Sequence, residues 1–247
     1  MAGGTPAGAG LRPARRPQAA KRRPRAPPLR VKIGGAKRGD IKMTELQKMV
    51  SGKLYDSTDA ELRHISAIAH GLCLKYNNTF EEEIQKRQEI IDELIPNKGT
   101  GVYLQGPIYF DYGCFTILGN NFYANFNLTV LDSCPVKIGD NVMIGPNCSL
   151  LTAVHPMRYQ DRNMRIKEDG SLFDYEYAKP ITIGSNCWLG GSVTVIGGVS
   201  IGEGCVIGAG SVVIKDIPEN CFAAGNPCRV IRPITDADRI ELKPELF

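Results

Sequence analysis

The sequence predicts a mainly β protein built on a parallel β-helix, and two regularities of spacing carry that prediction. Aliphatic residues recur every six positions without a slip, at Ile138, Ile144 and Leu150 and again at Ile183, Leu189, Val195, Ile201, Ile207 and Val213. A residue of small or medium size takes the fifth place of these sixes, at Val142, Cys148, Cys187, Val193, Val199, Cys205 and Ser211. This period matches neither an ordinary strand nor an α-helix. It indicates the hexapeptide repeats of a parallel β-helix.

Each repeat of six residues supplies one short strand and one turn, and three repeats close one triangular coil. Side chains about 18 residues apart should therefore stack on one another. We expect the leading aliphatic side chains to fill the interior and the small residues to fit the tight corners. Glycine often follows the leading aliphatic residue, as at Gly184 and Gly190. The β-helix is expected over residues 99–235, with irregular early coils before residue 136.

Three helices are expected between residues 44 and 95, ahead of the β-helix. Capping boxes predict their starts at Thr44–Gln47, Thr58–Glu61 and Thr79–Glu82. One apolar stripe follows each of the last two starts: Leu62, Ile65, Ala69, Leu72, Cys73 and Tyr76 in one helix, and Ile84, Ile91, Leu94 and Ile95 in the next. A single stripe implies that each helix packs on another surface. The open first coil of the β-helix, which needs a cap, is the expected surface.

The charge of the chain is divided unevenly between its first 42 residues and the rest. Residues 1–42 contain 12 Lys and Arg against one acid, and 21 of these 42 residues are Ala, Gly or Pro. We expect this basic leader to be disordered, because it has too little apolar surface to bury. The remainder contains 18 Lys and Arg against 25 acids. The basic total therefore gives no argument for a nucleic-acid partner.

The remaining boundaries follow from changes in the repeat. Residues 43–98 form the helical segment, and residues 236–247 form a C-terminal tail. The repeat breaks between residues 151 and 180 and resumes at Ile181. A long polar insertion ejected from a regular β-helix is a candidate functional loop.

The eight cysteines contain no CxxC pair, and Cys148, Cys187 and Cys205 occupy small corner positions of the repeat. A free cysteine there is a compact hydrophobic residue. We expect free thiols, a reducing compartment and a cytoplasmic location. No apolar run reaches the length of a membrane span, so no membrane partner is expected.

Histidine is scarce, and this scarcity narrows the candidate chemistry. His64 and His70 lie six apart on the second predicted helix and therefore on different faces. His155 is the only histidine in the repeat region, where the inserted loop leaves the β-helix. A zinc enzyme of the carbonic-anhydrase type needs three converging histidines and is disfavoured. No metal site is predicted.

Several segments closely resemble the maltose/galactoside O-acetyltransferases. They are Asp111-Tyr112-Gly113, Gly119–Asn127, Leu131-Asp132, His155-Pro156, Ile183–Gly190 and Ala223–Ile231, with Gly52–Tyr55 and Tyr76-Asn77 in the helical segment. The resemblance covers about residues 44–235 and implies a left-handed β-helix. It also implies acetyl transfer from acetyl-CoA to a sugar hydroxyl, and a homotrimer with each active site between two subunits.

The resemblance also implies roles for particular residues. His155 matches the general base, which would take the proton of the attacking sugar hydroxyl. The implied acceptor-binding residues are Asn125, Asp111, Asp56, Ser57 and Glu176. The implied cofactor-binding residues are Trp188, Gly191, Ala209, Ile214, Lys215, Arg229 and Arg232, where the Gly191 N–H would stabilise the oxyanion and the cations would meet CoA phosphates.

Two departures from the family pattern bear on the acceptor. Ser57, with Asp56 adjacent, stands where some members use an Asp. The loop over residues 157–177 is also longer than usual. Acetylation of a xenobiotic or amino sugar on the same fold is therefore the alternative activity. A non-catalytic hexapeptide scaffold is the remaining alternative, against which His155, Asn125 and Trp188 argue.

Overall fold

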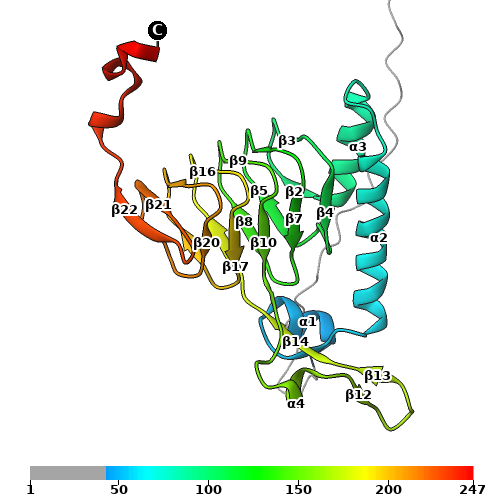
Figure 1. Ribbon diagram of the computed structural model, residues 1–247. Helices are drawn as coiled ribbons and strands as arrows, with labels where there is room; N and C mark the ends of the chain where they lie inside the picture. The colour runs from blue at the N-terminus through cyan, green and yellow to red at the C-terminus, as the bar shows by residue number, and fades with distance from the viewer. Residues whose placement is uncertain (1–42, 247) are drawn as a thin grey trace, which may run out of the picture. The chain divides into compact units, whose positions relative to one another are not determined.

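The computed structural model describes residues 43–246, and within this range the chain is a parallel β-helix with helices at one end (Figure 1). The predicted fold class is confirmed. Residues 1–42, for which the sequence predicts a disordered leader, lie outside the described residues.

Three parallel sheets form the faces of the β-helix. The first contains β2 (Asn97–Lys98), β5 (Thr116–Leu118), β8 (Val136–Ile138), β15 (Ile181–Ile183) and β18 (Ser200–Ile201). The second contains β3 (Tyr103–Leu104), β6 (Tyr123–Ala124), β9 (Met143–Ile144), β16 (Trp188–Leu189), β19 (Val206–Ile207) and β21 (Cys221–Ala224), with β22 (Arg229–Pro233) added antiparallel at its end. The third contains β4 (Ile108–Phe110), β7 (Leu128–Leu131), β10 (Ser149–Leu151), β17 (Thr194–Ile196) and β20 (Val212–Val213).

The predicted aliphatic stacks form the interior of these sheets. Ile183 pairs with Ile138 on one side and Ile201 on the other. Leu189 pairs with Ile144 and Ile207 in the second sheet. All the leading aliphatic residues and all the small corner residues named from the sequence are buried. The six-residue spacing therefore predicted both the strands and the direction of their side chains.

The corners of the coils explain two further sequence features. A Cβ on Gly184 would come within 2.6 Å of the Glu203 nitrogen in the next coil, so only glycine fits there. Asparagines take the left-handed conformation at other corners, with φ near 55–61°, a region that Asn tolerates. Their side chains form a ladder, in which Asn121 donates to Asn141 and Asn141 donates to Asn186. The sequence analysis did not anticipate this ladder.

Three helices precede the β-helix: α1 (Glu45–Val50), α2 (Ala60–Asn77) and α3 (Ile84–Leu94). The Thr44 capping box of α1 is confirmed. The other two predicted boxes are wrong. Asp59 caps α2 instead of Thr58, because its carboxylate accepts from the backbone of Glu61 and Leu62. Helix α3 begins after Glu83 with no side-chain cap, and Thr79 instead donates to the Tyr76 carbonyl.

Helices α2 and α3 pack against the first coils and share one core cluster with them. The predicted stripe of α2 is largely buried, but that of α3 is wrong at Ile84, whose side chain is 74% exposed. Arg87 is buried in its place. Its guanidinium donates to the Tyr76 hydroxyl and to the carbonyls of Leu104 and Gln105. The cap is thus held partly by a buried cation that satisfies open carbonyls of an early coil.

The inserted loop leaves after β10 and returns at β15. It contains β11 (Ala153–Val154), α4 (Tyr159–Arg162), β12 (Arg165–Ile166), β13 (Leu172–Phe173) and β14 (Tyr175–Ala178). Strands β12 and β13 form a hairpin that projects from the side of the β-helix (Figure 1). Asp140 and Ser185 are 45 positions apart yet hydrogen-bonded in adjacent coils. The repeat therefore resumes in register after the loop.

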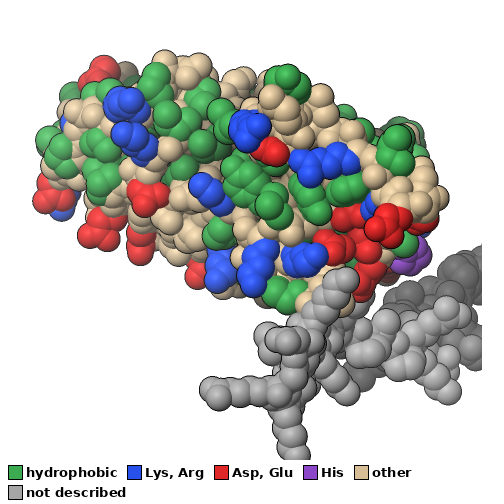
Figure 2. Space-filling model, turned by 90° about the horizontal axis from the view of Figure 1, so that it is seen from below, with side chains coloured by type: hydrophobic (Ala, Val, Ile, Leu, Met, Phe, Trp, Pro, Cys, Tyr) green, Lys and Arg blue, Asp and Glu red, His purple; other side chains and the backbone are tan. Residues whose placement is uncertain are grey.

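The C-terminal tail follows β22 as three short 3-10 helices, at Asp236–Asp238, Ile240–Leu242 and Pro244–Leu246. Among residues 43–246, no helix is both long and apolar enough to cross a bilayer. On the face shown in Figure 2, Lys and Arg side chains stand among apolar side chains and a group of acidic ones. The eight cysteines are free thiols.

We expect Arg87→Ala to lower the free energy of unfolding by about 3 kcal/mol, because hydrogen bonds from a charged donor to buried carbonyls are lost. Chemical denaturation measures this change. Glu93→Ala, at an exposed position of the same helix, is the control and should change stability by less than about 0.5 kcal/mol. Equal effects of the two substitutions would contradict the role of Arg87.

Candidate active site

His155 lies at the base of the loop, directly after a strand of a small sheet that is separate from the three faces. This sheet has the order β1-β14-β11, where β1 is Tyr55–Asp56. The register pairs Val154 with Tyr177 and Tyr55 with Glu176. His155 follows Val154 directly, so the antiparallel register brings it opposite Glu176. The start of the inserted loop is held by the buried Thr152, whose hydroxyl donates to the Leu131 carbonyl.

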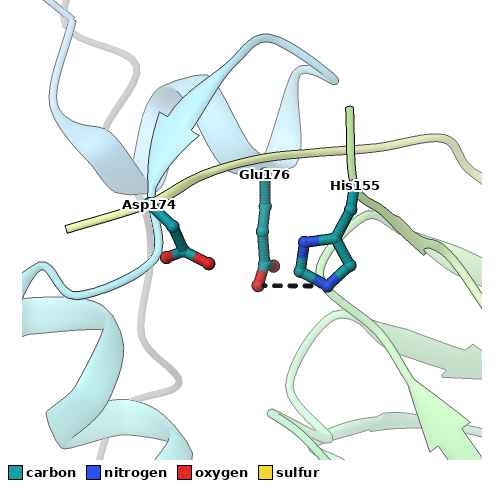
Figure 3. A group of neighbouring side chains, drawn as sticks. All are labelled: His155, Asp174 and Glu176. Atoms are coloured by element: carbon teal, nitrogen blue, oxygen red, sulfur yellow. Dashed lines mark ion pairs between the residues drawn. The ribbon is translucent and has the colours of Figure 1, made fainter. Parts of the chain in front are cut away.

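Glu176 lies between the hydroxyl of Tyr55 and the imidazole of His155. Tyr55 donates a hydrogen bond of 2.7 Å to Glu176 Oε2. The other oxygen, Oε1, is 3.8 Å from His155 Nε2, as the dashed line in Figure 3 marks. The imidazole is half exposed, whereas the carboxylate side chain is only 20% exposed. A half-exposed imidazole thus stands beside a more buried carboxyl group.

The predicted acceptor residues Asp56 and Ser57 are occupied by contacts with the loop. Lys167, before the hairpin turn, forms a 2.5 Å ion pair with Asp56. Burial alone would raise the pKa of Asp56, but the Lys167 ammonium and the hydrogen bonds from Thr58 lower it. The Ser57 hydroxyl donates to the carboxylate of Asp174. The structure therefore shows these two residues clamping the loop to the helical segment.

Asp111 lies close enough to Glu176 for their charges to interact. Burial, followed by the charge of Asp132, raises the pKa of Asp111 to about 6, although His70 at 3.7 Å opposes this rise. Asp132 is buried and accepts from the backbone N–H groups of Tyr112 and Gly113. Its carboxylate therefore fixes the turn that carries Asp111. His70, for which the sequence predicted only a place on the second helix, thus contacts a candidate acceptor residue.

His155, Asp174 and Glu176 are the group of three potential metal ligands within residues 43–246, with donor atoms within 4.8 Å of one another. Figure 3 shows both carboxylates on the side of the strand that faces His155. One imidazole and two carboxylates are suitable ligands for a divalent cation. The sequence disfavoured zinc sites built from three histidines or from CxxC pairs, whereas one histidine with two carboxylates is a different set of ligands.

Asn125 stands apart from this group. It follows β6, in the second sheet, and its side-chain oxygen accepts from the Phe126 N–H. Among the described residues, no hydrogen bond or ion pair joins Asn125 to His155. One chain therefore brings Asp111, Glu176 and His155 together without Asn125.

The candidate CoA-binding residues lie in the later coils. Trp188 is on β16, with half of its side chain exposed. Gly191 follows that strand, and its carbonyl accepts from the Gly210 N–H, next to Ala209 in the following coil. Within residues 43–246 the Gly191 N–H donates no hydrogen bond. A donor to an oxyanion must likewise have no partner within the protein.

The candidate cations lie towards the C-terminal end. Ile214 and Lys215 follow β20 and are exposed, while Arg229 and Arg232 are exposed on β22. Arg232 forms a two-pronged ion pair with Asp238, at 2.8 and 2.6 Å. This pair, together with hydrogen bonding, lowers the pKa of Asp238 to about 2.

Some contacts around the loop come from residues that were not predicted from the sequence. Tyr55, Asp174 and Lys167 were not named as site residues, although each contacts a residue that was. The pairing of Tyr55 with Glu176 spans 121 positions, so no local pattern could reveal it. The tyrosine did stand within the Gly52–Tyr55 segment of the resemblance, which was the available signal.

Three family patterns match this chain. The pattern described as the maltose acetyltransferase hexapeptide capping motif matches residues 48–99. The bacterial transferase hexapeptide, of six repeats, matches residues 180–215. The hexapeptide repeat of succinyl-transferase matches residues 135–154.

The chain is also similar to whole proteins. It is 40% identical to the galactoside O-acetyltransferase of Escherichia coli (strain K12) over 199 residues, which is 81% of this chain and 94% of the relative. A maltose O-acetyltransferase structure from Clostridium difficile 630 is 42% identical, with a TM-score of 0.71 over 78% of this chain and 99% of that chain. A galactoside acetyltransferase structure in complex with coenzyme A is 40% identical, with a TM-score of 0.72 over 80% and 94%.

Proposed function

Because the chain belongs to the maltose and galactoside O-acetyltransferase family, we propose that it transfers an acetyl group from acetyl-CoA to a sugar hydroxyl. The observation that carries the proposal is His155 at the base of the loop, half exposed and 3.8 Å from Glu176. The coenzyme A bound to a similar galactoside acetyltransferase supports acetyl-CoA as co-substrate.

In the proposed mechanism, His155 is the general base. Its neutral imidazole takes the proton of the sugar hydroxyl while the hydroxyl oxygen attacks the thioester carbonyl. No covalent enzyme intermediate is needed when both substrates are held together. The Gly191 N–H, which has no partner among residues 43–246, donates to the oxyanion of the tetrahedral intermediate. The imidazolium then returns its proton to the departing CoA sulfur.

The acceptor is proposed to lie against Asp111 and Glu176, with Asn125 completing its contacts. Asp56 and Ser57 act indirectly, because the loop already occupies their side chains. Trp188 and Ala209 border the acetyl and pantetheine path, and Ile214 lines the same groove. Lys215, Arg229 and Arg232 are proposed to meet the CoA phosphates, which favour charge-assisted hydrogen bonds.

We expect His155→Ala to lower kcat at least about 100-fold, the usual scale for loss of a general base. The melting temperature should stay close to that of the parent, because the side chain is half exposed. Release of free CoA, measured with a panel of sugars and amino sugars, gives the rate. Turnover near the parent level would refute the mechanism.

The same panel separates the proposed activity from its alternative. Acetylation of simple sugars supports the sugar O-acetyltransferase. Turnover confined to amino sugars or xenobiotics would instead support the alternative acceptor class, which is suggested by Ser57 and by the long loop.

The free thiols of all eight cysteines support a reducing, cytoplasmic location.

Neutralising Arg229 and Arg232 together, as Gln, should raise the KM for acetyl-CoA and leave kcat nearly intact. Such a pattern is expected for contacts that the ground state and the transition state share equally. Added salt should weaken CoA binding less in this variant than in the parent, because fewer ion pairs remain to be screened. Arg239→Gln, in the exposed tail, is the control. A rise in the KM for the sugar alone would show that the CoA groove is not where Arg229 and Arg232 lie.

A homotrimer is proposed as the active assembly. One chain gathers Asp111, Glu176 and His155, but Asn125 and the Gly191 N–H lie elsewhere on the β-helix. A second copy around a threefold axis would bring such separate surfaces together, and a closed ring satisfies every copy equally.

Light scattering on residues 43–247 should therefore give the mass of three chains. Mixing His155→Ala chains with Asn125→Ala chains should restore part of the activity, because some mixed interfaces then contain both intact side chains. A fully active monomer would rule out the shared site.

A further inference from the structure

One buried hydroxyl beside His155 has no role in the mechanism above. Tyr55 is 1% exposed and packs in a small apolar cluster with Met49 and Leu62. A phenylalanine ring would fill the same space. The hydroxyl instead reaches out of the cluster and donates to Glu176 Oε2 at 2.7 Å.

Backbone pairing places the two side chains of this hydrogen bond opposite each other. Tyr55 and Glu176 are directly paired residues of β1 and β14, so their side chains leave the sheet on the same side. Helix α1 also holds β1 in place, since Glu45 accepts a hydrogen bond of 2.8 Å from the Asp56 N–H. The backbone of Tyr55 therefore cannot move away from that of Glu176 without separating the two strands.

The Tyr55 hydroxyl is the donor in this contact, since the carboxylate of Glu176 is the acceptor. Burial first, and then the hydrogen bond and charge of Glu176, raise the pKa of Tyr55 above its ordinary value. Glu176 is the matching acceptor when it is ionised, and the remaining oxygen, Oε1, is left facing His155 Nε2 at 3.8 Å.

We propose that Tyr55 is a positioning residue, whose buried hydroxyl holds one oxygen of Glu176 so that the other faces His155. The inference rests on the proposed function, because Glu176 matters to turnover only when His155 gains a proton. The separation of 3.8 Å is too long for a hydrogen bond. It is short enough for the carboxylate to stabilise the imidazolium charge.

The reaction needs no proton from Tyr55 or Glu176. The acceptor hydroxyl gives its proton to His155 as its oxygen forms a bond to the thioester carbon. Collapse of the tetrahedral intermediate breaks the carbon–sulfur bond, and the proton passes from His155 to the CoA thiolate. Neither Glu176 nor Tyr55 gains or loses a proton in these steps. Their effect is confined to the stability of the charged imidazole.

Holding the carboxylate matters because a glutamate side chain has several rotatable bonds. Without a donor, Glu176 could turn its charge away from His155 and towards solvent. Asp174, the other carboxylate of the trio, is held in the same way by the Ser57 hydroxyl. Tyr55 differs from Ser57 in being buried, so its donor cannot turn to water.

The test compares Tyr55→Phe with Tyr112→Phe. Tyr112 packs beside the same cluster, and its hydroxyl makes no hydrogen bond within residues 43–246. We expect Tyr55→Phe to lower kcat about tenfold, the scale for losing a hydrogen bond to a charged group. The KM for acetyl-CoA should not change. Tyr112→Phe should leave kcat and the melting temperature as in the parent.

A double-mutant cycle identifies the route of the effect. If Tyr55 acts through Glu176, Tyr55→Phe should have no further effect on kcat in a Glu176→Gln background. Independent, multiplying losses would overturn the inference, as would unchanged kcat in Tyr55→Phe. Assays of the parent in EDTA check the alternative use of the trio. Loss of parent activity on metal removal would assign the three side chains to a cation and would also overturn the inference.

A spectroscopic measurement separates this inference from the proposed function. The chain has three histidines, so the imidazole nitrogen signals can be assigned by substituting each one. The His155 signal should move in the same direction in Tyr55→Phe and Glu176→Gln, while that of His64 stays constant. An unmoved His155 signal in Tyr55→Phe would overturn the positioning role. A parent that acetylates no sugar would instead refute the proposed function and leave the nitrogen signals to decide on Tyr55.

Discussion

The stacking of each coil on the next is the constraint on which the rest of this structure depends. Backbone hydrogen bonds join Ile138, Ile183 and Ile201 into one ladder, and a slip of one residue would turn every inward aliphatic side chain outward. The chain can therefore leave the β-helix only where it can return at the same register. It does so once, between β10 and β15. Because both ends of the excursion are fixed, the loop has a rigid base from which His155 projects.

The helical segment at the start of the described chain contacts two other parts of the molecule. Its helices α2 and α3 cover the apolar end of the first coils, where open carbonyls are satisfied by the buried Arg87. Its strand β1 then extends the small sheet formed by the loop. A β-helix supplies regular strands but no irregular cavity of its own. The contacts between β1 and the loop convert a flexible insertion into a defined arrangement of acids around a histidine.

The sequence predicted most where one spacing determined one outcome. The six-residue repeat specified the strands, their stacking and the buried faces, because every coil repeats the same geometry. Helix starts were predicted less well, since Thr58 and Asp59 are both good caps and only the backbone path decides between them. Ile84 has the apolar character of a stripe residue, but Arg87 took the buried position because its donors match free carbonyls.

The sequence named candidate site residues but not the contacts between them. His155, Asp111 and Glu176 lie near one another as the resemblance implied, while their roles remain predictions. Tyr55 and Asp174 were missed because their partners are more than a hundred positions away along the chain. Asp56 and Ser57 contact the loop through Lys167 and Asp174, and their expected part in acceptor binding stays a prediction. The sequence pattern shows which polar residues are unusual. Strand pairing decides which of these residues already form hydrogen bonds or ion pairs with other side chains of the protein.

Charge is sorted along the β-helix in a way that bears on the substrates. Asp111, Asp132 and Glu176 are close enough to influence one another's ionisation, and burial of the first two already opposes their negative charge. Another anion bound there would meet both effects. Arg229 and Arg232 lie on β22, after the last coil, whereas Asp111 follows β4 in an early coil. The acidic group therefore suits a neutral or cationic acceptor, such as an uncharged sugar or an amino sugar, and disfavours one that carries a carboxylate or phosphate. Arg229 and Arg232 carry the opposite charge, and their proposed contacts with the CoA phosphates would distinguish the two reactants by charge before any contact with their reacting atoms is made.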